Sequence, residues 1–213
     1  MGAHVPVPDM TRGCPAVALR RHAVRRPDGI SRSQTNVPEH EPDGALPRAR
    51  GLLLVQVLDL PESLGGAEAV RREAAEVRAS GPARVRDVEY TAFDESVRED
   101  LVAITAQMTV GEIVALVGSE RDVYALRSVA LSLGFEPEEV VTRCLDRETQ
   151  SADGVHWSST DAVRELFCVH CRDIFPARAA VGDAVRCPTC QVVLVVEYNF
   201  SGHRAAYLAS QLR

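Results

Sequence analysis

Four cysteines near the C-terminal end of the sequence are the residues whose type and spacing most clearly indicate chemistry. Cys168 and Cys171 form one Cys-x-x-Cys pair, fifteen residues follow, and Cys187 and Cys190 form a second pair. Each pair can wrap one edge of a tetrahedron, so two pairs can supply four thiolates to a single ion. The sequence therefore predicts one metal site, with four ligands: Cys168, Cys171, Cys187 and Cys190.

Other uses of paired cysteines fit this spacing less well. Two disulfides belong to oxidising compartments, and a dithiol redox centre uses one such pair rather than two. Covalent heme attachment needs a histidine directly after the second cysteine, where Arg172 and Gln191 stand. Four thiolates accept either zinc or iron. Rubredoxins, which hold iron, favour glycine at the positions of Arg172 and Gln191, so the pattern favours zinc and leaves iron open.

The chain that precedes the cysteines alternates between strand and helix patterns. Apolar runs predict four strands, at 52–58, 84–90, 112–117 and 138–143. Apolar residues at helical spacing predict three helices, from Ser63 to about 80, from about 95 to 107, and from Ser119 to 133. Strand, helix and strand within 111–145 indicate a βαβ unit and hence a parallel sheet. The predicted fold class is α/β, a parallel-sheet βαβ core followed by a small zinc-ribbon or rubredoxin-like module with four cysteines.

The turn at Gly118-Ser119 is a candidate phosphate site, because it presents a helix N-terminus at the carboxyl end of a strand. The sequence has no G-x-G-x-x-G motif and no P-loop motif. A purely structural turn is therefore the favoured interpretation. The β-α-β similarity to the nucleotide half of flavin reductases concerns architecture alone.

The composition changes along the chain and predicts three parts. Residues 1–48 contain seven of the twelve prolines and too little apolar surface to fold alone, which predicts a flexible leader. Residues 49–150 form the α/β domain, and residues 151–213 form the metal-binding module. The module ends in a tail rich in aromatic residues, which we expect to dock on a partner subunit. A terminal helix packed on its own core is the alternative for this tail.

Composition also limits the classes of function. The chain of 213 residues has a net charge of -6, which argues against a nucleic-acid partner. It has no apolar stretch that could span a membrane and begins without the apolar region of a secretory signal, so we expect a cytoplasmic protein with no membrane partner. No nucleophile with a base and no pair of carboxylates stands out, so we expect no catalytic residue in this chain.

The sequence around the cysteines resembles the small accessory subunit of bacterial dimethylamine monooxygenase. The resemblance rests on FCVHCRDIF at 167–175 and on RCPTCQVVLVVEYNFSGHRAAYLAS at 186–210. There the second cysteine pair leads into a strand and then into the Asn-Phe-Ser and Ala-Tyr steps. The segment ALVGSERDVYALRSVALSLGFEPEEV, at 115–140, also resembles the central domain of that subunit. The resemblance covers about residues 51 to 213.

This resemblance implies a subunit of a heterotrimeric oxygenase, the heme-dependent oxidative N-demethylase complex. The complex converts dimethylamine to methylamine and formaldehyde with NADPH and O2. Heme would lie in a catalytic partner subunit, and FMN and an iron–sulfur cluster in a reductase partner subunit. This chain would hold only its four-cysteine iron or zinc, for structure or for electron transfer, and would not be catalytic alone. The alternative is a zinc-ribbon interaction module unrelated to oxidation. Basic residues only modestly outnumber acidic ones after residue 162, so that module would bind protein rather than nucleic acid.

Overall fold

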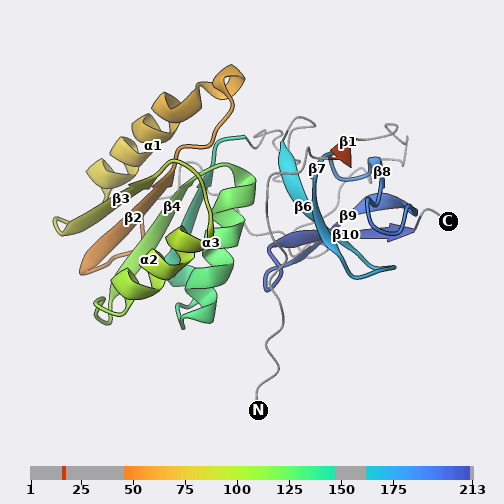
Figure 1. Cartoon of the computed structure of the whole chain (residues 1–213). Coiled ribbons are helices and arrows are strands. Elements are labelled where there is room, and N and C mark those ends of the chain that lie inside the picture. The colour runs from red at the N-terminus through yellow and green to blue at the C-terminus, as the bar shows by residue number, and fades with distance from the viewer. Residues whose placement is uncertain (1–15, 18–45, 147–161, 212–213) are drawn as a thin grey trace, which may run out of the picture.

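The computed structural model of the chain describes residues 16–17, 46–146 and 162–211, which fold around two β-sheets (Figure 1). Cys14, His156, Trp157 and most of the predicted leader lie outside the described residues. No helix in the described ranges is long and apolar enough to cross a membrane.

The first sheet has four parallel strands in the order β3-β2-β4-β5. These strands are β2 (Gly51–Val57), β3 (Val85–Tyr90), β4 (Glu112–Gly118) and β5 (Val140–Cys144). Every residue of β2 and β4 is buried, as their continuous apolar runs predict for strands covered on both faces. The predicted α/β class with a parallel sheet is confirmed.

Helices cover both faces of this sheet. The core cluster on one face contains α1 (Gly66–Ser80), and the cluster on the other contains α2 (Glu95–Thr105) and α3 (Glu120–Ser132). The prediction that Ser63 caps the first helix is wrong. Ser63 lies in a short 3-10 turn, Glu62–Leu64, and the helix begins after Gly65, whose φ of 93° is left-handed. Glycine adopts that conformation without the steric cost of a side chain.

The second sheet has six strands in the order β1-β7-β6-β10-β9-β8. They are β1 (Ala16–Val17), β6 (Val163–Cys168), β7 (Ile174–Arg178), β8 (Ala184–Arg186), β9 (Val193–Ser201) and β10 (Ala206–Gln211). Neighbours are antiparallel except for β1 with β7 and β10 with β6, which are parallel. The two residues of β1 lie within the predicted leader, which stays a prediction.

The C-terminal segment is part of this sheet, and the prediction that it is a docking tail is wrong for residues 198–211. Strand β10 inserts between β6 and β9 and bonds to both. Phe200 and Tyr207 face each other across β9 and β10 and are each only 2% exposed. These two aromatic side chains, which suggested a partner interface, therefore pack in the chain's own core. The alternative of a terminal helix is wrong too.

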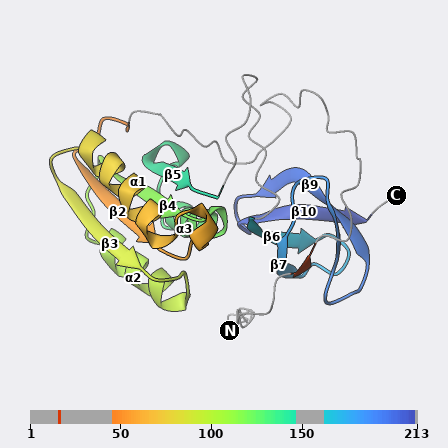
Figure 2. The same ribbon diagram turned by 90° about the horizontal axis from the view of Figure 1, so that it is seen from above.

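The six-stranded sheet packs against the four-stranded one on the side where α3 lies (Figures 1 and 2). The ring centroid of Phe200 lies 4.8 Å from that of Tyr124, on α3, and 5.2 Å from that of Tyr207. One apolar cluster includes residues of both sheets, among them Leu116 on β4 and Leu166 on β6. The two sheets thus share a continuous hydrophobic core.

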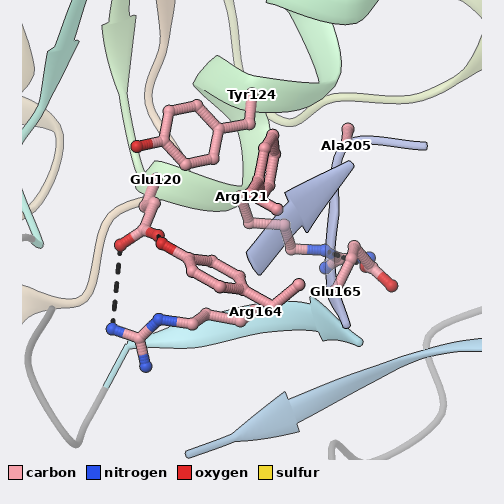
Figure 3. Close-up of a pocket in the computed structure, with 8 residues that line it drawn as sticks. Glu120, Arg121, Tyr124, Arg164, Glu165 and Ala205 are labelled. Atoms are coloured by element: carbon pink, nitrogen blue, oxygen red, sulfur yellow. Dashed lines mark hydrogen bonds and ion pairs between the residues drawn. The ribbon is translucent and has the colours of Figure 1, made fainter. Parts of the chain in front are cut away.

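Buried charges complete this junction. Glu120, at the start of α3, and Arg164, on β6, are each 1% exposed, and their charged groups lie 3.7 Å apart. Figure 3 shows the Glu120 carboxylate directed toward the Arg164 guanidinium. The Tyr207 hydroxyl donates to the same carboxylate, and Arg121 forms an ion pair with Glu165 at 2.6 Å. The junction therefore fixes two neighbouring strands against α3: β6, which leads to the first cysteine pair, and β10, which pairs with it.

Candidate metal centre

Two turns of the six-stranded sheet carry the four cysteines. The first turn lies between β6 and β7 and holds Cys168 and Cys171, and the second lies between β8 and β9 and holds Cys187 and Cys190. We call these turns the first and second knuckle. The two knuckles belong to different hairpins, and the sheet brings them together.

The backbone of the two knuckles follows the same hydrogen-bond pattern. In the first, the N–H of Arg172 donates to the carbonyl of Cys168 at 2.8 Å, and the N–H of Cys168 donates to the carbonyl of Asp173 at 2.8 Å. In the second, the corresponding bonds run from Gln191 to Cys187 and from Cys187 to Val192, both at 3.0 Å. The spacing Cys-x-x-Cys therefore gives two copies of one turn.

Arg172 and Gln191 occupy left-handed backbone positions, with φ of 66° and 61°. These are the positions where the sequence lacks the glycine that rubredoxins favour. A non-glycine residue there costs on the order of 1 kcal/mol, but the turn keeps its shape. The missing glycines therefore give no argument for zinc over iron.

The four sulfur atoms lie together at the distances that a single ion requires. All four are within 4.8 Å of one another, with 3.8 Å between the sulfurs of Cys168 and Cys190 and 3.6 Å between those of Cys171 and Cys187. A tetrahedron with metal–sulfur bonds of about 2.3 Å has edges of about 3.8 Å. A disulfide would need about 2.05 Å, and these cysteines are free. The donor set fits zinc or iron, and metal binding by it stays a prediction.

The environment of the sulfurs differs between inner and outer positions. Cys168 and Cys187 are fully buried, and burial raises the pKa of both thiols, to about 12 for Cys187. Cys190 is partly exposed, and the backbone N–H of Val192 lowers its pKa to about 6. The backbone N–H groups of Cys171 and His170 act against burial at Cys168, because each lowers the pKa of that thiol, as the N–H of Val192 does for Cys190. Such N–H groups stabilise thiolates, the form that binds a metal.

The candidate phosphate site at Gly118-Ser119 is occupied by the chain's own side chains. The Ser119 side chain caps α3 through the N–H of Asp122, and the carboxylate of Asp146 accepts the N–H of Glu120 at 2.6 Å. Burial raises the pKa of Asp122 and of Asp146 to about 6. A phosphate would have to displace these carboxylates at the helix N-terminus, so the geometry agrees with the interpretation of a structural turn.

Known families provide one comparison. Residues 165–209 match the family described as "Dimethylamine monooxygenase subunit DmmA-like, C-terminal domain". The match confirms the resemblance predicted from the sequence for these 45 of the 213 residues. It runs from β6 to β10 and contains all four cysteines. Neither the curated proteins nor the solved structures contain a match to the chain.

The four cysteines stand out in the sequence, whereas the polar residues of the junction do not. Glu120 and Tyr207 are 87 residues apart in the chain and meet at the junction. Arg164 belongs to no motif that the sequence shows, and it is almost fully buried. A single sequence holds no signal for pairs so distant, because each residue alone fits an exposed position as well.

Proposed function

We propose that this chain is the metal-binding accessory subunit of a heterotrimeric heme and flavin dimethylamine monooxygenase. The complex would convert dimethylamine to methylamine and formaldehyde with NADPH and O2. The observation that carries the proposal is the family match over 165–209, because the matched segment contains the complete two-knuckle site. A chance likeness of cysteine spacing alone would not extend through β9 and β10.

The metal centre is the part of this chain that we assign to the complex's chemistry. Cys168, Cys171, Cys187 and Cys190 would hold one ion, which as zinc would add folding energy and as iron could also carry one electron. The two inner cysteines anchor the site in the core, while Cys171 and Cys190 reach the surface. Any electron that passes between this centre and a partner subunit would therefore pass on the side of Cys171 and Cys190.

The redox cofactors are assigned to partner subunits, heme to a catalytic subunit and FMN with an iron–sulfur cluster to a reductase. Within the described ranges, the four cysteines are the one cluster of three or more side chains placed to hold a metal. The α/β domain carries carboxylates where a nucleotide fold binds phosphate. Both observations support a bracing role for this chain rather than a separate reductase role.

Purification of the native complex through a tag on this chain tests the proposal. We expect heme and flavin absorption bands to co-purify with the chain, and dimethylamine-dependent NADPH oxidation with release of formaldehyde. A Cys171→Ser variant should lose the metal, whereas Cys144→Ser, which removes a buried cysteine outside the site, should keep it. A chain that purifies alone, with zinc and without heme or flavin partners, would contradict the proposal and favour a zinc-ribbon interaction module.

A further inference from the structure

Side chains break the symmetry of the two knuckles. The third position of each Cys-x-x-Cys is His170 in the first knuckle and Thr189 in the second. The residue whose carbonyl closes each turn is Asp173 in the first and Val192 in the second. Because the backbones match, these two pairs of positions can be compared directly.

Asp173 and Thr189 join the knuckles on one side of the site. The Thr189 hydroxyl donates to the Asp173 carboxylate, across 16 residues of sequence. The Asp173 carboxylate also accepts the N–H of Ile174 at 3.0 Å, and its backbone carbonyl accepts the N–H of Cys168. Asp173 is thus fixed to the first knuckle at two points and holds the second knuckle by its side chain.

The equivalent position on the other side has no such link. Val192 has no side-chain acceptor, and His170 interacts with the sulfur of Cys190 instead. Because the Cys190 sulfur is itself a proposed metal ligand, this contact cannot hold the knuckles together independently of the ligands. The Asp173–Thr189 bond touches no sulfur and can do so.

We propose that Asp173 and Thr189 are positioning residues that clamp the two knuckles and set how long the metal stays bound. The inference rests on the metal site proposed above and holds for zinc or iron. Each knuckle supplies two ligands, so separation of the knuckles breaks the ligand set and allows the ion to leave. A side-chain bond between the knuckles opposes that separation without taking part in coordination.

Release of Co(II) from the purified full-length chain tests the clamp. Co(II) bound by four thiolates absorbs visible light, so its transfer to excess chelator can be timed directly. Thr189→Val removes the hydroxyl with little change in shape, and we expect release about fivefold faster, the effect of losing one hydrogen bond of ordinary strength. Asp173→Asn keeps an acceptor oxygen and should stay within about twofold of the wild-type rate.

A control variant and a second readout separate the clamp from general stability. Thr105→Val removes a hydroxyl that donates to the Leu101 carbonyl within α2, remote in sequence from the metal centre, and should leave release unchanged. The thermal midpoint of the metal-free Thr189→Val protein should match that of the wild type. A Thr189→Val chain that releases Co(II) at the wild-type rate would overturn the clamp and would leave the proposed metal site standing. A wild-type chain that binds no Co(II) would overturn the metal site, and the clamp with it.

Discussion

Removal of one partner from the buried pair of Glu120 and Arg164 should strongly destabilise the chain. Replacing Arg164 with Met keeps an unbranched apolar stem and removes the guanidinium with its charge. The Glu120 carboxylate, 1% exposed, would then stay buried without its cation. Leaving one partner of a buried ion pair uncompensated costs about 3–5 kcal/mol. Since domains have about 5–15 kcal/mol of stability in total, we expect a large shift of the unfolding midpoint.

Denaturant unfolding of the metal-loaded protein measures this cost, with an exposed ion pair as the matched control. Arg71 and Glu89 lie 3.0 Å apart with side chains 47% and 43% exposed, so Arg71→Met should cost less than about 1 kcal/mol. The double variant Glu120→Gln/Arg164→Met should regain part of the loss, because no buried charge remains unpaired. Equal costs for Arg164→Met and Arg71→Met would refute the argument that the junction depends on this pair.

Three further predictions concern the core, the metal and pH. Phe200→Ala should cost about 3–5 kcal/mol in denaturant unfolding, because Phe200 fills the junction between Tyr124 and Tyr207; a cost below 1 kcal/mol would contradict the shared core. Cys187→Ser should abolish metal binding and also raise hydrogen exchange in α3, since the metal-bearing sheet packs on that helix; exchange limited to residues after 162 would show instead that the two sheets fold independently. Burial raises the pKa of Asp122 from 3.8 to about 6, so the folded state binds the extra proton between these values. The associated stability is present below about pH 4 and is lost as pH rises through about 6. Asp122→Asn should make the unfolding free energy fall less steeply over that interval, and Asp146, whose pKa is raised likewise, should supply the remaining slope.

The sequence predicted the features that depend on local pattern. Continuous apolar runs identified β2 and β4, because a strand buried on both faces has no polar side to reveal. The start of α3 was predicted at Ser119, whose side chain caps the helix through the N–H of Asp122. The clustering of the four cysteines was predictable because each Cys-x-x-Cys is a local turn, and two such turns have few other uses.

Features that depend on distant partners were missed. The segment from residue 198 to the end of the chain suggests a docking tail, because its aromatic residues and end position are equally typical of an interface. Its strand conformation depends on hydrogen bonds to β6, about 40 residues earlier, which no local pattern encodes. The Asp173–Thr189 bond was missed for the same reason, since it joins residues of two different turns.

The central claim is that one ion is held by four cysteine thiolates. X-ray absorption at the metal edge of the purified full-length chain tests it most directly, together with the metal content per chain. The account predicts one ion per chain with a first shell of four sulfurs at about 2.3 Å. Nitrogen or oxygen atoms in place of a sulfur, or a metal-free chain with its cysteines in disulfides, would contradict it.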